Sequence, residues 1–166
     1  MSQSLPALVD RVGQALLARH WMLVAAESCT GGWIAKVITD LAGSSRWFER
    51  GFVTYSNAAK MELLGVQETT LATHGAVSAA TVNEMTQGAL AHSHAQIAVA
   101  VSGIAGPDGG SAEKPVGTVW LGWMVKSGVP RNHCHQFNGD REAVRLQAVI
   151  AALEGVLEIV NDGGTG

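Results

Sequence analysis

The sequence predicts an α/β protein, a three-layer α/β/α sandwich built on a mixed central sheet. Three observations lead to this fold class. Segments with helical periodicity and segments with strand character are interspersed along the chain. Residues 97–102 form an uninterrupted apolar run, which is typical of a strand at the buried centre of a sheet. Residues 117–125 and 131–137 have strand patterns and are joined by the short segment 126–130, which predicts a hairpin.

The first half of the chain is expected to form six segments. They are a helix over residues 5–19, a strand over 21–26, a helix over 31–41, a loop over 43–50, a strand over 51–56 and a helix over 57–64. Asn57 is placed to cap the last of these helices, because asparagine side chains accept hydrogen bonds from the free amides of a first turn. Gly65 is placed to end it.

The second half continues the alternation. Ser78 is expected to cap a helix that reaches about His92, and the apolar strand over residues 97–102 follows. After the hairpin, a final helix is expected from Asp140 to Val160, and residues 161–166 are expected to fray. Residues 1–160 are therefore expected to form a single domain, since no linker or internal repeat is visible.

Composition narrows the function classes. The chain has 166 residues, 47% of them hydrophobic, and a formal net charge of -3. Its few Lys and Arg residues are scattered, so nucleic acid is not an expected partner. We also expect no membrane association and a cytoplasmic location, because no apolar run approaches the roughly 18 residues that a membrane span needs. Cys29 and Cys134 are expected to be free thiols.

The segment from Val24 to Gly32 has the pattern of a strand that presents a nucleophile. An apolar run leads into Ser28, Cys29 and Thr30, and the double glycine Gly31-Gly32 then opens a helix. Helix starts carry unpaired amide N–H groups, so an oxyanion formed beside Ser28 is expected to find donors at Thr30, Gly31 and Gly32. The alternative is structural, with Ser28 or Thr30 simply capping the following helix.

A second group, Tyr55 and Lys60, lies where a strand ends and the next helix begins. A desolvated lysine can act as the base that a serine nucleophile requires, and Tyr55 can orient or relay. Alternatively, Lys60 is a solvated helix residue and Tyr55 a core ring. A rival system pairs Cys29 with His74 as a thiol nucleophile and its base.

The loop over residues 102–110 contains four glycines, which favours close approach of an anion to the backbone. It lacks the ending of a P-loop and the spacing of the dinucleotide fingerprint, so neither an NTPase nor a Rossmann enzyme is supported. The alternative is an ordinary flexible connection. Arg141 or Arg145 is a candidate to clamp a phosphate, and Arg141 is favoured because it lies in the first turn of its helix.

Three separated motifs together resemble the CinA C-terminal domain family, the nicotinamide-nucleotide amidases. They are residues 26–32 (AESCTGG), residues 55–57 (YSN) with Lys60, and residues 102–110 (SGIAGPDGG) with residues 114–119 (KPVGTV). The similarity spans about residues 5–160, and the combination is specific although each motif alone is modest. The chain is similar to the stand-alone form of the family, which lacks the N-terminal molybdopterin-binding-like domain of longer members.

The resemblance implies hydrolysis of the carboxamide of nicotinamide mononucleotide to nicotinic acid mononucleotide and ammonia, a salvage step in pyridine nucleotide metabolism. It implies Ser28 as nucleophile, Lys60 as general base and Tyr55 as the third catalytic hydroxyl, acting through a serine acyl-enzyme without a metal or redox cofactor. The ribose phosphate is expected at the glycine loop and at Arg141, with these loop residues as candidates: Gly103, Ile104, Ala105 and Gly106.

Two other interpretations stay open. The domain is either an enzyme or a nucleotide-binding regulatory or assembly module that performs no turnover, and a Cys29-dependent hydrolase is a further possibility. The set of Ser28, Tyr55 and Lys60 favours the enzyme, since a binding module has no chemical need for it. Apolar helix faces make a homodimer the expected assembly.

Overall fold

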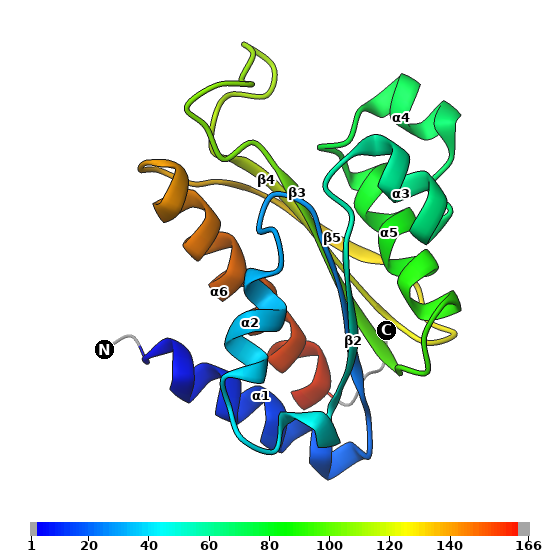
Figure 1. Cartoon of the computed structure of the whole chain (residues 1–166), viewed down its shortest axis with the longest axis vertical. Helices are drawn as coiled ribbons and strands as arrows, with labels where there is room; N and C mark the ends of the chain where they lie inside the picture. The colour runs from blue at the N-terminus through cyan, green and yellow to red at the C-terminus, as the bar shows by residue number, and fades with distance from the viewer. Residues whose placement is uncertain (1–2, 163–166) are drawn as a thin grey trace.

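The computed structural model describes residues 3–162, which form a five-stranded sheet between two layers of helices (Figure 1). The strands are β1 (Leu23–Glu27), β2 (Phe48–Val53), β3 (Ile97–Gly103), β4 (Thr118–Val125) and β5 (Arg131–Gln136). The helices are α1 (Leu5–Arg19), α2 (Trp33–Thr39), α3 (Asn57–Leu64), α4 (Glu68–His74), α5 (Ala79–Ala91) and α6 (Arg141–Asn161), with a 3-10 turn η1 (Ser44–Arg46). The three-layer α/β/α sandwich expected from the sequence is confirmed.

The sheet has the strand order β2-β1-β3-β4-β5. β1 is parallel to both of its neighbours, whereas β4 is antiparallel to β3 and to β5, so the sheet is mixed as expected and the hairpin is confirmed. The carboxyl ends of β1, β2 and β3 consequently meet at one edge of the sheet. Loops that follow these strands are brought together there, which is where α/β sheets of this kind bind ligands.

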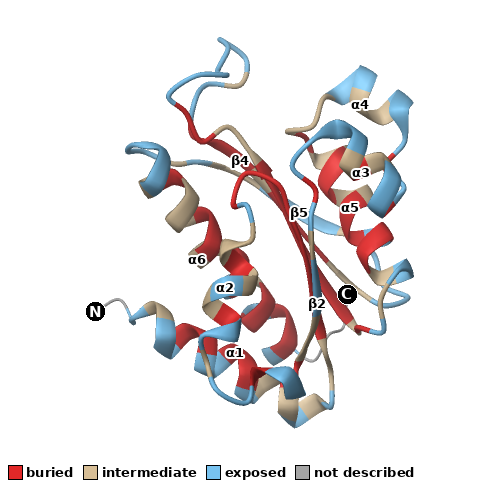
Figure 2. Ribbon diagram, viewed as in Figure 1, coloured by how far each residue is buried: buried red, intermediate tan, exposed pale blue. Residues whose placement is uncertain are grey.

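Each face of the sheet is covered by its own helices. α1, α2 and α6 lie on one face and α3, α4 and α5 on the other (Figure 1). Side chains along β1 alternate between the two cores, because successive residues of a strand point to opposite faces. Leu23 and Ala25 pack with the α1, α2 and α6 layer, and Val24 and Ala26 with the α3, α4 and α5 layer. The central strands are buried along their length, as Figure 2 shows.

Of three helix-capping residues predicted from the sequence, two are found in the structure and one is not. Ser78 caps α5 by accepting a hydrogen bond from the amide of Thr81, and Gly65 ends α3 in the left-handed region at a φ of 70°. The cap of α3 is Ser56 rather than Asn57, since the Ser56 hydroxyl accepts from the amide of Ala59 at 3.0 Å. The prediction for Asn57 was therefore wrong by one residue.

Three elements differ more. β2 begins at Phe48, inside the segment expected to be a loop, because an edge strand with no fully buried residue lacks an apolar signature. α4 was not anticipated, and it too contains no buried residue. α2 begins only at Trp33, because Gly31 and Gly32 form a turn with φ values of 58° and 101°.

The last helix, α6, continues through Asn161, one residue beyond its expected end. Residues 163–166 of the expected tail lie outside the described residues. None of the helices in the described part of the chain is long and apolar enough to cross a membrane.

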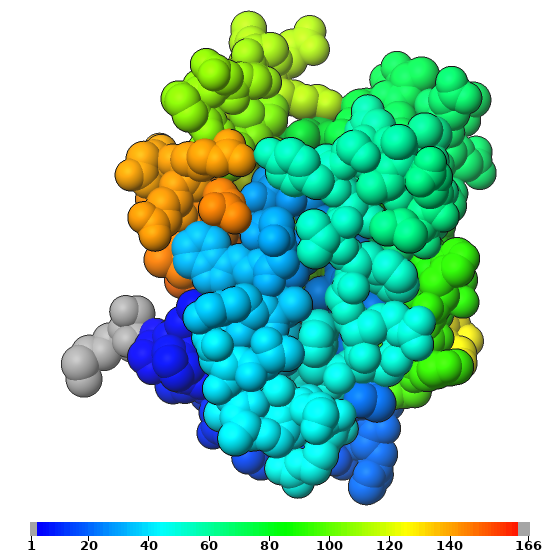
Figure 3. Space-filling view, in the orientation of Figure 1, coloured from blue at the N-terminus to red at the C-terminus, as the bar shows by residue number. Residues whose placement is uncertain are grey.

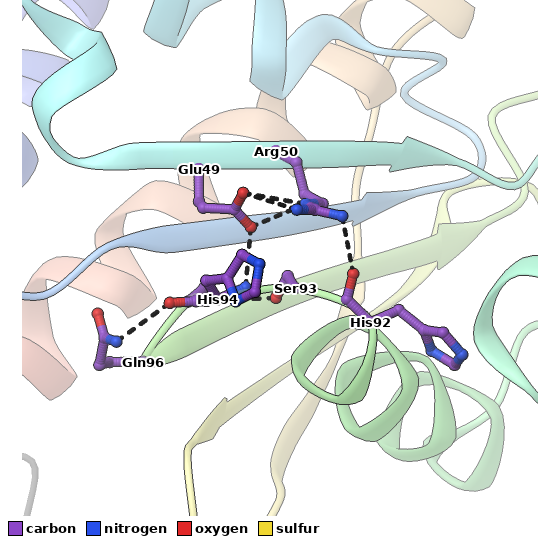
Figure 4. A network of polar contacts seen from close by, with 7 residues as sticks. Glu49, Arg50, His92, Ser93, His94 and Gln96 are labelled. Carbon is purple, nitrogen blue, oxygen red and sulfur yellow. Dashed lines mark hydrogen bonds and ion pairs between the residues drawn. The ribbon is translucent and has the colours of Figure 1, made fainter.

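A surface network holds the start of β2 in place (Figure 4). The guanidinium of Arg50 donates to the carboxylate of Glu49 and to the carbonyl of His92, and the amide of His94 donates to the same carboxylate. These contacts join the edge strand to the segment between α5 and β3. Because Arg50 is exposed, water and salt screen the Glu49–Arg50 ion pair, and we expect the pair itself to contribute little to stability.

Candidate active site

A cavity of about 280 Å³ lies beside the carboxyl ends of β1 and β3. Its walls are contributed by the turn after β1, by Tyr55 and the start of α3, by the segment before α5, by the end of β3 with its following residues, and by the start of α6. Figure 3 shows the start of α6 in orange and the teal segment around residue 55 approaching each other at this surface, with the yellow-green loop of residues 104–117 projecting above them.

Ser28 and Lys60 meet in this cavity, although 32 positions separate them in the sequence. Lys60 Nζ lies 3.0 Å from Ser28 Oγ and 2.9 Å from the carbonyl oxygen of Thr54, with the carbonyl of Tyr55 at 3.5 Å. Lys60 is 1% exposed and Ser28 is 7% exposed. The structure thus brings together the two residues predicted as nucleophile and base.

Burial changes the chemistry of Lys60. It lowers the pKa of the amine below its ordinary value of 10.5, because desolvation penalises the ammonium form. A neutral amine has two N–H donors and one lone pair. The carbonyls of Thr54 and Tyr55 match the donors, and the lone pair is left for the hydroxyl proton of Ser28. This is the arrangement a general base requires.

The local sequence explains how Lys60 reaches this position. Ser56 starts α3 at the end of β2, and Lys60 follows one turn later. Lys60 and Leu64 are the buried residues of α3, four positions apart and therefore on the same face of the helix. Leu64 anchors that face in the core, which directs the Lys60 stem towards the sheet.

Cys29 lines the cavity but is poorly suited to be the nucleophile. Burial raises the pKa of its thiol to about 11, so the reactive thiolate is disfavoured. His74, its proposed partner, is not part of the cavity wall, and its carbonyl accepts a hydrogen bond from Lys114 Nζ at 2.8 Å. The geometry therefore favours Ser28 over Cys29.

The turn that carries Ser28 is fixed by Glu27, a residue that sequence reasoning missed. Glu27 is 1% exposed and points to the face opposite Ser28, under the start of α2. Its carboxylate accepts from Thr30 Oγ1 at 2.6 Å and from the amides of Gly32 at 3.2 Å, Ile34 at 2.9 Å and Ala35 at 3.0 Å. Glu27, and neither Ser28 nor Thr30, provides the cap of α2.

Arg145 holds the same turn from another side. Its guanidinium donates to the carbonyl oxygens of Cys29 at 3.0 Å and Thr30 at 3.2 Å, and it stacks over the ring of Trp33. The C=O and N–H of one trans peptide point in opposite directions. The contact with the Cys29 carbonyl therefore turns the amide N–H of Thr30 away from Arg145.

The expected oxyanion donors are only partly available. The amide of Gly31 donates to the carbonyl of Ser28, and the amide of Gly32 donates to Glu27. Within residues 3–162, the amides of Cys29 and Thr30 are the two in this turn that donate to no carbonyl or carboxylate oxygen. Of the three residues predicted for this role, Thr30 is the one that keeps a free amide.

The glycine loop also differs from expectation. Gly103 and Ala105 line the cavity, whereas Ile104 and Gly106 do not. The amide of Ile104 donates to the carbonyl of Thr118 and its carbonyl accepts from Gly117, so this part of the loop continues the pairing with β4. Ile104 therefore offers no free amide to a phosphate, whereas the amides of Ala105 and Gly106 donate to no group within residues 3–162.

Arg141 and Tyr55 lie at the rim. Arg141 donates to the carbonyl of Gly106 at 2.9 Å and to the hydroxyl of Tyr55 at 3.3 Å, and Tyr55 is 63% exposed. The Tyr55 side chain thus lies at the mouth of the cavity, while its carbonyl faces Lys60. Four further wall residues were not among the predicted site residues: Asn57, Ala76, Val77 and Ser102. Asn57 and Ser102 belong to the quoted motifs, which was the available signal.

Glu27→Gln is expected to destabilise the protein by about 1–3 kcal/mol. The substitution replaces one carboxylate oxygen, which accepts hydrogen bonds from backbone amides, with an NH₂ group that can only donate. Chemical denaturation measures the change in the free energy of unfolding. Glu154→Gln, on the exposed side of α6, is the matched control and should stay within about 0.5 kcal/mol of the unaltered protein. Equal stability of the two variants would contradict the capping role of Glu27.

The fold and the buried contact between Ser28 and Lys60 define an α/β/α protein with a serine–lysine pair at the carboxyl edge of its sheet, an arrangement suited to nucleophilic hydrolysis. A model of the CinA C-terminal domain matches residues 6–160 of this chain. The chain belongs to the CinA C-terminal domain family.

Known relatives agree with this assignment. A protein of Enterobacter agglomerans named nicotinamide-nucleotide amidohydrolase PncC is 63% identical over 146 residues, covering 88% of this chain and 89% of that protein. The protein of the same name from Escherichia coli strain K12 is 61% identical over 149 residues, covering 89% of each. The crystal structure of the competence/damage inducible protein CihA from Agrobacterium tumefaciens has a TM-score of 0.91 at 46% identity, covering 97% of this chain and 99% of that one.

Proposed function

We propose that this protein hydrolyses the carboxamide of nicotinamide mononucleotide to nicotinic acid mononucleotide and ammonia. The observation that carries the proposal is the 3.0 Å contact between Lys60 Nζ and Ser28 Oγ in a cavity at the carboxyl edge of the sheet. The substrate is inferred from relatives 61–63% identical that are named nicotinamide-nucleotide amidohydrolases.

The reaction begins with attack of Ser28 Oγ on the carboxamide carbon. Neutral Lys60 takes the hydroxyl proton as the new C–O bond forms, and the resulting ammonium returns that proton to the amide nitrogen as the C–N bond breaks. Ammonia leaves and an ester to Ser28 is formed. Water, activated by Lys60 in the same way, then cleaves this acyl-enzyme and restores both residues.

The negative charge of the tetrahedral intermediate needs donors that are already in place. The free amides of Cys29 and Thr30 adjoin Ser28 in the same turn, which Glu27 and Arg145 hold rigid through six hydrogen bonds. Donors fixed in this way need no reorganisation when the charge develops. We assign the oxyanion to these two amides.

The phosphate of the substrate is assigned to the rim, at Arg141. A guanidinium recognises phosphate through paired hydrogen bonds, and Arg141 lies on the cavity wall beside the Tyr55 hydroxyl. Arg141→Met is expected to raise KM for the mononucleotide by about tenfold while kcat changes little, because it removes binding remote from the reacting bond.

The riboside, which lacks the phosphate, provides the comparison for Arg141. Its kcat/KM should change by less than about twofold in Arg141→Met. Arg46→Met, an exposed arginine in η1, is the matched control and should leave both substrates unaffected. An equal loss of kcat/KM for the mononucleotide and the riboside would contradict the assignment of the phosphate to Arg141.

An ammonia assay across nicotinamide, its riboside and its mononucleotide tests the proposed function. We expect a strong preference for the mononucleotide. A protein that binds the mononucleotide without releasing ammonia would instead be a binding module, the alternative class.

We further propose a homodimer, supported by an apolar groove of about 380 Å³ between α1 and α2, which light scattering in solution would test.

A further inference from the structure

Ser102, near the end of β3, carries a hydroxyl that forms no hydrogen bond with any of the described residues. The residue is 1% exposed and lines the cavity, yet its Oγ makes no hydrogen bond within residues 3–162. No side-chain nitrogen or oxygen that is sealed from solvent lacks a partner in this part of the chain. The Ser102 oxygen therefore opens into the cavity.

The sheet register places this hydroxyl beside the nucleophile. β1 and β3 are parallel neighbours, with Glu27 opposite Val101, and the amide of Ser28 extends the ladder by donating to the carbonyl of Val101. Ser28 and Ser102 are thus the next pair along two strands about 4.8 Å apart. Alternation puts both side chains on the face covered by α3 and α5, the face from which Lys60 arrives.

The two other hydroxyl groups that line the cavity, those of Ser28 and Tyr55, already have partners. Ser28 Oγ is hydrogen-bonded to Lys60 Nζ, and the Tyr55 hydroxyl accepts a hydrogen bond from the guanidinium of Arg141. The free amides of Cys29 and Thr30 are donors and suit the oxygen of a bound carboxamide. A carboxamide also has an NH₂ group, on the other side of its carbon, which requires an acceptor. Ser102 Oγ is the free hydroxyl acceptor next to the nucleophile.

We propose that Ser102 is a substrate-binding residue whose Oγ accepts a hydrogen bond from the carboxamide N–H and orients the nitrogen towards Lys60. The assignment rests on the proposed amidohydrolase function. Ser102 neither gains nor loses a proton in the reaction. The proton of Ser28 passes to Lys60 and from there to the departing nitrogen, so a correctly oriented nitrogen makes this transfer direct.

The test compares an amide with an ester. Ser102→Ala should lower kcat/KM for nicotinamide mononucleotide by about tenfold, the effect of one buried hydrogen bond. The methyl ester of nicotinic acid mononucleotide has no N–H, so its kcat/KM should change by less than about twofold. Ser102→Cys keeps the side-chain shape at a slightly larger size and offers a weak acceptor, so the same selective loss is expected in it.

Ser44→Ala is the matched control, since it removes a buried serine hydroxyl from η1, at the opposite edge of the sheet. It should leave both substrates unchanged. Equal losses on amide and ester in both Ser102 variants, or no loss on the amide, would overturn the role of Ser102. If the unaltered protein released no ammonia from the mononucleotide, the proposed function itself would fail, independently of Ser102.

Discussion

Ser28→Ala is expected to lower kcat for ammonia release from nicotinamide mononucleotide by about 10⁴-fold or more. Without Oγ no acyl-enzyme forms, and Lys60 loses the hydroxyl that lies 3.0 Å from its amine. The substitution removes one buried oxygen and leaves the turn intact, because Glu27 and Arg145 bond to other atoms of it. Binding of the mononucleotide, measured by calorimetry, should therefore stay within about threefold of the original.

Cys29→Ala is the natural control for this experiment, since it changes the adjacent wall residue of the same turn. We expect it to keep kcat within about threefold, because the buried thiol takes no part in the proton transfers. Mass spectrometry after rapid quenching should find the acyl group on the peptide that contains Ser28. Full activity of Ser28→Ala, or loss of activity only in Cys29→Ala, would replace the serine mechanism with a thiol mechanism.

Lys60→Met is expected to lower kcat by about 10³-fold to 10⁴-fold, because it removes the base and keeps much of the apolar stem. The pH profile of the unaltered enzyme reports the same group. Lys60 must be neutral to act, so kcat/KM should rise with pH until it passes the pKa of Lys60, which burial holds below 10.5. A full-rate Lys60→Met enzyme would leave the base unassigned.

The Lys60→Met substitution should affect stability in the opposite direction from activity, although both quantities should rise with pH in the unaltered protein. Between the lowered pKa and 10.5, the unfolded chain binds more protons than the folded one, so the free energy of unfolding should rise with pH in this interval. Lys60→Met should lack that rise. At neutral pH we expect it to be at least as stable as the original, because it removes the desolvation cost of a buried amine. A lower Tm for Lys60→Met would contradict this.

The strand with the strongest burial pattern was predictable from sequence, whereas the first half of β2 and the whole of α4, which have no buried residue, were not. β3 is an uninterrupted apolar run, and burial on both faces is what produces such a run. β2 has a sheet neighbour on one side only and carries Glu49 and Arg50, which engage each other at the surface. The sequence of its first half, residues 48–50, resembles a loop because this location does not require apolar side chains.

The contact between Ser28 and Lys60 was predictable because each residue stands in a distinctive local motif, whereas the contacts that support this pair depend on tertiary structure. Nothing local indicates that Glu27 reaches beneath α2, since its donors come from residues up to eight positions away on a different element. The position of Ser102 beside Ser28 likewise follows only from the register of β1 against β3. Sequence motifs identify residues with suitable chemistry, and the strand order and register of the sheet determine which of these residues come into contact.

The alternation of β1 also limits how the gene for this protein can change length. Insertion or deletion of one residue within β1 would exchange the two faces of the strand beyond that point, burying the Ser28 hydroxyl under α2 and directing the Glu27 carboxylate at the substrate. Codon gains and losses should therefore be tolerated in the exposed segment 107–113 and be lethal to activity between Leu23 and Ser28.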